Sequence, residues 1–143
     1  MKINARELKG DALDWAVART EGWLPHGDRG DLYKTAVVRG VEIKSLLFPG
    51  KHLDQGGMPE PRSYSPSTDW SQGGPLIEQH AIELHNNIGE QYGEEERRYA
   101  VVPISASGSR GAMGPTPLVA AMRALVFAKL GDQIEVPEEL ARA

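Results

Sequence analysis

Residues 64–78, which read YSPSTDWSQGGPLIE, bring together side chains that could recognise a small ligand. They combine hydroxyls, a carboxylate, an indole and two glycines, with too few apolar residues for a core segment and more chemical variety than a linker needs. An indole in a glycine-flanked turn can stack on a base or another flat ring. A neighbouring carboxylate can accept hydrogen bonds from a ribose or an amide. We therefore expect a recognition loop that runs into a helix.

Each residue of this segment also has a structural interpretation. Trp70 could fold back onto the core, and Asp69 could cap a helix or close a turn, a role that suits the preceding Ser-Pro-Ser-Thr. The hydroxyl side chains could be caps as well. The candidate ligand-binding residues in this segment are Tyr64, Ser67, Thr68, Asp69, Trp70, Gly73 and Gly74.

A second candidate site is the glycine-rich segment Ser105–Gly114, which we expect to form a loop between a strand and the last predicted helix. Glycines let successive backbone N–H groups point into one concavity, and the helix N-terminus adds partial positive charge, so the segment suits a phosphate or another anion. A flexible, hairpin-like excursion is the alternative, and the Gly-Lys-Ser/Thr ending of a nucleoside-triphosphate loop is absent. Arg110 could act as a bidentate donor. The candidate residues here are Ser107, Gly108, Arg110 and Thr116.

Catalytic and metal chemistry have little support in the sequence. There is no cysteine, and the four histidines do not form a metal-binding pattern. His80 and His85 are five residues apart, so neither a helix nor a strand places them on one face. A Gly-x-Ser-x-Gly nucleophile signature and an acid–base pair are also missing. We therefore expect no catalytic residue, no metal and no cofactor, and a protein that is not an enzyme.

Composition limits the class of partner. The net charge of −4 disfavours nonspecific binding to nucleic acid, which requires a basic surface. No run of apolar residues is long enough to cross a membrane, and the N-terminus lacks the apolar stretch of a signal peptide. We expect a cytosolic protein with a single domain over residues 1–143, a length that can bury a core.

Hydrophobic periodicity and turn residues predict the elements that must position these sites. The regular elements are a helix over 11–21, strands over 33–38, 41–48, 81–86 and 98–104, and a long helix that Thr116 caps and Gly131 ends. A helix that started at Asp69 would carry Pro75 in its interior, which is unfavourable. We therefore expect an irregular turn over 69–74 and a short helix from Pro75 to about His80.

Two other segments are predicted to be irregular. Residues 49–66 are rich in proline and glycine and indicate a long loop, and the residues after 132 indicate a short tail. The order of helices and strands predicts an α+β protein in which a mostly antiparallel sheet is covered by helices.

Three stretches of the chain together resemble one family. They are Gly10–Ala18, Tyr64–Glu78, and Gly114–Arg123 with its continuation through Lys129–Asp132 and Val136–Pro137. They resemble the NinX-like bacteriophage accessory proteins, a family of unknown function, and leave residues 23–60 and 86–112 uncovered. The resemblance implies a small phage protein in the host cytoplasm that folds as a helix-sheet-helix sandwich. It implies no catalytic residue.

Phage accessory genes of this size often encode inhibitors of host defence, and some of their products sequester nucleotide signals. By that analogy we expect a non-catalytic protein that binds a small nucleotide-like ligand, a cyclic dinucleotide or an ADP-ribose derivative, in a cleft shared by Trp70 and the segment 105–114. Pockets of this kind often form between subunits, so a homo-oligomer is expected. The alternative is a protein-interaction module that inhibits a host enzyme through residues 49–63 and the acidic segment 89–96.

Overall fold

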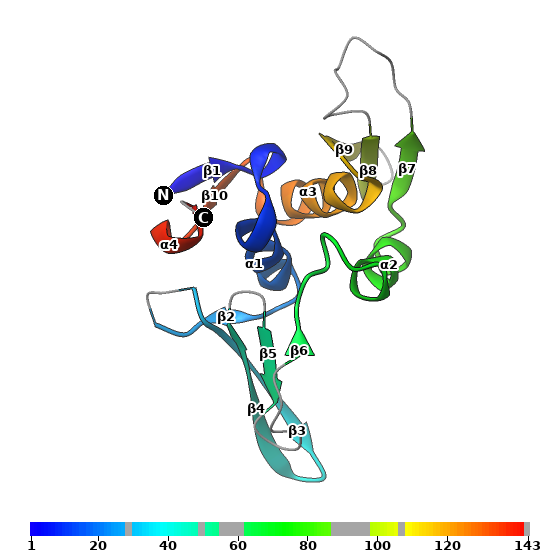
Figure 1. Ribbon diagram of the computed structural model, residues 1–143. Coiled ribbons are helices and arrows are strands. Elements are labelled where there is room, and N and C mark those ends of the chain that lie inside the picture. Colours follow the sequence, from blue (N-terminus) through cyan, green and yellow to red (C-terminus); the bar gives the residue numbers. More distant parts are fainter. Residues whose placement is uncertain (28–29, 49–50, 55–61, 87–97, 106–107, 142–143) are drawn as a thin grey trace.

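The computed structural model describes residues 1–27, 30–48, 51–54, 62–86, 98–105 and 108–141. These residues form helices and three antiparallel sheets, so the predicted α+β class is confirmed (Figure 1). The helices are the 3-10 helix η1 (Ala5–Glu7), α1 (Gly10–Thr20), α2 (Trp70–Gln79), α3 (Pro117–Leu130) and α4 (Glu138–Ala141).

The strands of the described residues are divided among three sheets. The first pairs β1 (Lys2–Asn4) with β10 (Gln133–Glu135). The second has the order β2 (Leu24–Pro25), β3 (Leu32–Val38), β4 (Val41–Phe48), β5 (Lys51–Asp54) and β6 (Arg62–Ser63). The third has the order β7 (Glu83–Asn86), β8 (Arg98–Ser105) and β9 (Gly108–Gly114).

Helix α3 begins and ends where the sequence predicts. The Thr116 hydroxyl accepts a hydrogen bond from the Val119 N–H over 3.1 Å, and Pro117 occupies the first helical position, where its missing N–H does no harm. Gly131 follows the last turn with a φ of 95°, a conformation that favours glycine. Both helix ends are therefore fixed by local chemistry.

Helix α3 is also the centre of the larger core, because η1, α1, β8 and β9 all pack against it. Residues 120–126 are buried without exception, and the only charged one among them is Arg123. Its Nε donates to the Leu8 carbonyl over 2.7 Å, and its Nη1 donates to the Met113 carbonyl over 3.0 Å. A buried charge is tolerated when its donors are hydrogen-bonded. These bonds therefore hold the residue after η1 and the strand β9 against α3.

A second, smaller core lies between α1 and the five-stranded sheet. It consists of the buried residues Ala18, Trp23, Leu32 and Leu47. Trp15, on α1, packs against both cores. Figure 1 shows α1 between α3 and the β2–β6 sheet, with the β3–β4 hairpin extending away from the body of the protein. Helix α1 is thus the element that joins the two halves of the fold.

The β3–β4 hairpin confirms the two strands predicted on either side of Gly40. Arg39 and Gly40 form its turn with φ values of 52° and 78°, and two successive positive φ angles match the twist of a tight hairpin. Val37 and Val41, beside the turn, are 73% and 61% exposed. The tip of the hairpin therefore lies beyond the smaller core.

Helix α2 corrects the predicted start of the second helix. It begins at Trp70 rather than at Pro75, and the predicted turn before Pro75 is wrong. Asp69 caps the helix, because its Oδ1 accepts a hydrogen bond from the Ser71 N–H over 2.9 Å. Pro75 removes one backbone hydrogen bond, and Gly74 before it has no Cβ to meet the proline ring. The cap and the packing of α2 against the larger core outweigh the lost bond.

Two segments that were predicted to be irregular contain strands. Residues 108–114 form β9, which pairs with β8, so the prediction of a glycine-rich loop is wrong for these residues. The predicted loop over 49–66 contains β5 and β6, which continue the sheet from β4, while residues 55–61 and the acidic segment 89–96 lie outside the described residues. The β9 sequence GSRGAMG lacks strong strand formers, so its pairing with β8 determines its backbone. The strands predicted before and after 89–96 are confirmed as β7 and β8.

Residues 133–141, which were predicted to be a tail, contain β10 and α4. Strand β10 pairs with β1, with Ile3 opposite Ile134. Ile134 and Leu140 are buried in the larger core. This pairing joins the two ends of the chain, and its energy comes from burial of apolar side chains that no local sequence pattern connects.

Gly73→Ala should destabilise the fold, because Gly73 leaves no room for a methyl group. A Cβ at this position would press on the Pro66 carbonyl oxygen and lie 2.6 Å from Leu118 Cδ2. We expect the free energy of unfolding, measured by urea denaturation, to fall by about 1–3 kcal/mol. Gly108→Ala is the matched control, since its Cβ would meet only an ordinary contact at 3.5 Å. Equal losses in the two variants would contradict the close packing of α2 on α3.

Candidate ligand pocket beside helix α1

Helix α1 carries polar side chains on two faces. Trp15 and Arg19 are one turn apart and share one face. Asp14 lies on another face, and Glu21 follows as the C-cap residue. The first face borders β10. The second face borders the chain that leads into α2, and α2 itself. The position of α1 between the two cores therefore creates two separate polar environments.

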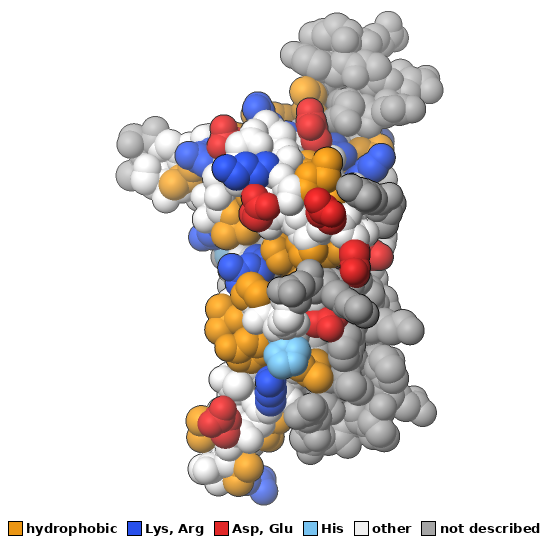
Figure 2. Space-filling view, turned by 90° about the vertical axis from the view of Figure 1, so that its left-hand side faces the viewer, with side chains coloured by type: hydrophobic (Ala, Val, Ile, Leu, Met, Phe, Trp, Pro, Cys, Tyr) orange, Lys and Arg blue, Asp and Glu red, His pale blue; other side chains and the backbone are white. Residues whose placement is uncertain are grey.

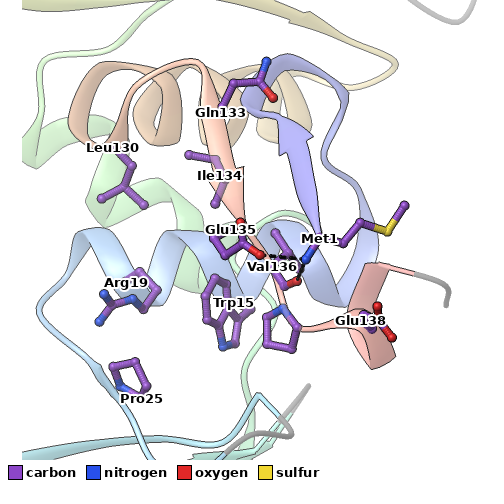
Figure 3. A pocket seen from close by; sticks show the side chains of 11 residues that line it. Met1, Trp15, Arg19, Pro25, Leu130, Gln133, Ile134, Glu135, Val136 and Glu138 are labelled. Carbon is purple, nitrogen blue, oxygen red and sulfur yellow. Dashed lines mark hydrogen bonds and ion pairs between the residues drawn. The ribbon is translucent and has the colours of Figure 1, made fainter.

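A pocket of about 510 Å³ opens on the face of α1 that carries Trp15 and Arg19 (Figure 3). Its walls come from α1, β2, the end of α3, and β10 with the residues that follow it. The pocket is lined by Met1, Trp15, Arg19, Pro25, Leu130, Gln133, Ile134, Glu135, Val136, Pro137 and Glu138. Pockets of this size are typical of sites for small ligands.

Apolar side chains form most of the pocket wall, and Arg19 supplies a positive charge among them. Figure 3 shows Trp15 and Arg19 projecting from α1 below Leu130 and Ile134. The Arg19 Nη1 donates a hydrogen bond to the Trp23 carbonyl over 2.8 Å, which fixes the guanidinium and leaves its other N–H groups for a ligand. No carboxylate in the described part of the chain forms an ion pair with Arg19. The arrangement suits a ligand with an apolar body and one anionic group.

The acidic side of the pocket is partly neutralised. The N-terminal ammonium group of Met1 donates to Glu135 Oε1 over 2.8 Å and to the Val136 carbonyl over 3.1 Å. Hydrogen bonding to this ammonium group lowers the pKa of the Glu135 carboxyl, so Glu135 is ionised at neutral pH. Figure 2, which faces this side of the molecule, shows acidic and basic side chains interspersed over the upper half. The surface around the pocket therefore does not repel anions as a whole.

The Trp15 indole contributes its apolar surface rather than its donor. Its Nε1 is buried and has no hydrogen-bond partner within the described residues. Buried donors are nearly always hydrogen-bonded, and an unbonded one is costly. Because protein atoms cover this nitrogen, we assign to Trp15 the role of an apolar wall.

The other face of α1 holds a buried carboxyl group. Asp14 Oδ1 accepts a hydrogen bond from the Ser67 N–H over 2.9 Å, and the Ser67 hydroxyl also bonds to this carboxyl. Burial raises the pKa of Asp14 to about 6, although these bonds oppose the shift. Burial, and then the nearby Asp14 and Glu21 charges, raise the pKa of Tyr64 above its usual range. Glu21 Oε1 also lies 3.4 Å from His80 Nε2, at the end of α2.

The residues predicted in the segment 64–74 are placed by these contacts and by α2. Tyr64 packs against the smaller core, and Ser67 is buried against Asp14. Asp69 caps α2, and its hydrogen bonds with Ser71 lower its pKa. Thr68, Trp70, Gly73 and Gly74 lie in or just before the first turns of α2.

Trp70 does not fold back onto the core, because its side chain is 54% exposed at the first position of α2. Gly73, by contrast, is buried against Pro66 and Leu118. The cap interpretation of Asp69 is confirmed. Roles of Trp70, Thr68 and the other residues of this segment as ligand contacts stay predictions.

The second predicted segment contacts a different part of α3. Arg110, in the middle of β9, donates from Nη1 to the Phe127 carbonyl over 2.9 Å, and its guanidinium lies 4.8 Å from the centre of the Phe127 ring. Gly108 begins β9, and Thr116 caps α3. Ser107 lies outside the described residues.

The two predicted segments contact different parts of α3, and a cleft shared between them stays a prediction. Gly73 packs at Leu118, near the start of α3, whereas Arg110 packs at Phe127. Leu118 and Phe127 are nine residues apart, which is roughly 13 Å along a helix axis. Gly73 and Arg110 therefore lie toward opposite ends of one helix, although Thr116 caps the end that Gly73 contacts. The pocket beside α1 contains no residue from either segment.

Sequence reasoning missed the residues that line this pocket and those buried beside it. The signal for Arg19 was weak: it lies four residues after Trp15, at the edge of the apolar face of the predicted helix. The signal for Asp14 was stronger, because it stands beside Leu13 and Val17 on that apolar face. The wall formed by β10 had no sequence signal at all.

Comparison with known proteins identifies the family. A family model described as Bacteriophage P22, NinX matches residues 4–129, including the stretches 23–60 and 86–112 that the sequence resemblance left uncovered. Because the match covers most of the chain, the chain belongs to this bacteriophage family. No curated protein matches it. Within the described residues, no helix is both long and apolar enough to span a bilayer.

Stability should fall as the pH rises from about 4 to about 6, because of Asp14. Its folded-state pKa of about 6 lies above the ordinary value of 3.8, so in this window the folded protein keeps a proton that the unfolded chain has released. This contribution is complete below the unfolded pKa and is lost as the pH passes the folded pKa. Urea denaturation across the window measures it as a falling free energy of unfolding.

Asp14→Asn should flatten this part of the pH profile, because the amide oxygen still accepts the Ser67 hydrogen bond and carries no charge. Asp132→Asn, at an exposed position away from α1, is the control and should keep the fall. If the Asp14→Asn protein shows the same decrease as the wild type, Asp14 is not the group responsible.

Proposed function

We propose that this member of the bacteriophage NinX family binds a small nucleotide-like molecule in the pocket beside α1 and holds it without catalysis. The observation that carries the proposal is the pocket of about 510 Å³, in which Arg19 stands among apolar walls. A nucleotide-like ligand joins a flat ring to an anionic group. It therefore needs apolar surface and a cationic donor from the same site.

Arg19 is the residue that we expect to bind the anionic group. Its bond to the Trp23 carbonyl keeps the guanidinium in place, so little side-chain entropy is lost when a ligand binds. A guanidinium pairs with phosphate through two parallel hydrogen bonds, which a lysine cannot do. Trp15 and Pro25 offer apolar surface to the ring. Gln133, on β10, has an amide that can both donate to and accept from the edge of a base.

The groups that line the pocket suit binding rather than reaction. The lining side chains include no histidine, lysine, serine or tyrosine, and the groups that could act as a base are the carboxylates of Glu135 and Glu138. Glu135 is held by the N-terminal ammonium group and is therefore a poor proton acceptor. We propose sequestration, in which the ligand leaves the pocket chemically unchanged.

Membership in a bacteriophage family supports a role inside the infected host. Phage accessory proteins of this size often inhibit host defence, so we propose a signalling nucleotide of that defence as the ligand, either a cyclic dinucleotide or an ADP-ribose derivative, bound in the host cytoplasm. A homo-oligomer, which the sequence suggested, stays a prediction.

Arg19→Gln should weaken ligand binding by about tenfold or more, because it removes a charge-assisted hydrogen-bond pair. Isothermal titration calorimetry against cyclic dinucleotides, ADP-ribose and its derivatives measures the dissociation constants. Lys9→Gln is the matched control: it makes the same change of charge at an exposed position just before the other end of α1, and should bind as the wild type does.

Two results would count against this proposal. If no member of the panel gives a heat of binding, nucleotide-like molecules of this class are not the ligand. A tight ligand whose affinity Arg19→Gln leaves unchanged, with both proteins equally stable to heat, would place the ligand elsewhere on the molecule.

The exposed indole of Trp70 supports a second candidate function, a module that binds a host protein. Trp70 is 54% exposed at the start of α2, and exposed tryptophans are enriched among the residues that dominate protein interfaces. The contact surface that the sequence suggested at 89–96 lies outside the described residues, as does most of the one at 49–63. Trp70 is therefore the residue on which this alternative is best tested.

If the alternative holds, the wild-type protein will recover a stoichiometric host protein from lysate, and Trp70→Ala will lose it. Ile104→Ala, at another exposed apolar side chain, should retain the partner. Retention of the partner by Trp70→Ala would exclude Trp70 as the contact. Recovery of no protein at all would favour the small-ligand proposal.

A further inference from the structure

Two arginines contact the same aromatic ring on α3. The guanidinium carbon of Arg6, in η1, lies 5.2 Å from the centre of the Phe127 ring, and that of Arg110, in β9, lies 4.8 Å from the same point. The two carbons are therefore no more than about 10 Å apart. Two residues separated by most of the chain thus bring their charges to one place.

Both guanidinium groups are held by more than the ring. Arg110 Nη1 donates to the Phe127 carbonyl, and carbonyl groups in the last turns of a helix favour a cation. Arg6 Nε donates to Asn4 Oδ1 over 3.4 Å, and the Asn4 side chain also accepts from the Arg6 backbone N–H. An arginine that stacks on an aromatic face keeps its other N–H groups free to point outward from the ring edge. The pair is accordingly ordered before any ligand binds.

The described residues supply no counter-ion for this pair. Neither Arg6 nor Arg110 forms an ion pair with a carboxylate of the described chain. Two positive charges at this separation repel each other, and an anion that contacts both would relieve the repulsion. Arg6 is exposed and Arg110 is half-buried. A ligand can therefore reach the pair from solvent, and part of the site is shielded from water.

We infer that Arg6 and Arg110, held on the Phe127 ring, form a binding site for the diphosphate group of a small phosphorylated molecule. A single phosphate can contact one guanidinium through two hydrogen bonds. A diphosphate carries oxyanions on both phosphorus atoms and can contact both guanidinium groups at once. The chemistry of the pair therefore selects a short chain of phosphates over a lone carboxylate or phosphate.

The charge around the pair selects a small ligand over a nucleic acid. Glu7 follows Arg6 directly, and the Asp132 carbonyl accepts a hydrogen bond from the Ala5 N–H, so two exposed acidic residues flank η1. The net charge of the chain is −4. A nucleic acid strand needs an extended basic surface, whereas a diphosphate needs only the two guanidinium groups.

This site is separate from the pocket beside α1, since neither Arg6, Arg110 nor Phe127 lines that pocket. The inference therefore does not depend on the proposed function. Binding at either site can fail while binding at the other persists.

Calorimetry with inorganic pyrophosphate at low ionic strength tests the inference. We expect saturable binding to the wild-type protein, about tenfold or greater weakening in Arg6→Gln and in Arg110→Gln, and loss of binding in the double variant. Arg110→Lys keeps the charge and loses the planar fork of the guanidinium. It should retain part of the affinity, which would show that substitution of Arg110 leaves the protein folded.

Two further variants test the role of charge. Lys44→Gln, on the separate five-stranded sheet, should bind as the wild type does. Asp132→Asn should bind more tightly, because it removes a nearby negative charge.

Three results would overturn the inference. They are no binding of pyrophosphate to the wild-type protein, pyrophosphate binding that the folded double variant retains, and tighter binding of a single-stranded oligonucleotide than of pyrophosphate. The last result would identify the pair as part of a nucleic-acid surface. Orthophosphate, measured in parallel, should bind more weakly than pyrophosphate; equal affinity would show that the two arginines do not act together.

Discussion

The burial of α3 on all sides is the constraint on which the rest of the fold depends. A helix whose residues 120–126 are all hidden from water has no solvent-facing side, so other elements must cover it in every direction. They come from both ends of the chain: η1 and α1 from the N-terminus, and β8 and β9 from the second half. Arg123 adds directional hydrogen bonds to this apolar packing. Its donors require the Leu8 and Met113 carbonyls at fixed positions, and an unmet donor at that depth would be costly.

Helix α1 contributes to two sites because of this packing. Helix α1 packs against both the larger and the smaller core. Its other faces therefore lie between elements that belong to different sheets. One such face becomes the wall of a pocket, with Arg19 fixed by the Trp23 carbonyl. The other holds Asp14 among buried groups, where its carboxyl keeps a proton to a higher pH than an exposed aspartate does. The packing of α1 between the two cores therefore explains both the pocket and the pH-dependent contribution of Asp14 to stability.

The parts of the fold that the sequence predicted are those that local chemistry controls. Thr116, Pro117 and Gly131 fix the ends of α3 by capping, and the apolar pattern before Gly22 identifies α1 by the face that it buries. The parts that it missed are decided by distant contacts. The interior Pro75 argued locally against a helix, but the fit of Gly73 against Leu118 stabilises α2 from a segment more than forty residues away. Strand β9 and the pairing of β1 with β10 likewise depend on partners that no local pattern reveals. The candidate pocket was missed for the same reason, because about half of its lining residues belong to β10 and the residues that follow it. Within the segment 64–74, the sequence correctly indicated the cap at Asp69 and left a buried and an exposed Trp70 equally open. It could not show that Arg110 packs toward the other end of α3.

The central claim is that the cavity beside α1 holds a small nucleotide-like ligand, and it can be tested on protein taken from host cells with an active defence. The most direct measurement is mass spectrometry of small molecules released by denaturing the purified protein, compared between the wild type and Leu130→Trp, which narrows the rim of the pocket at a half-exposed side chain. The account predicts a nucleotide-like molecule, about one per chain, that the wild type carries and Leu130→Trp lacks. A wild-type protein that releases no such molecule, or a variant that carries it in equal amount, would contradict the claim.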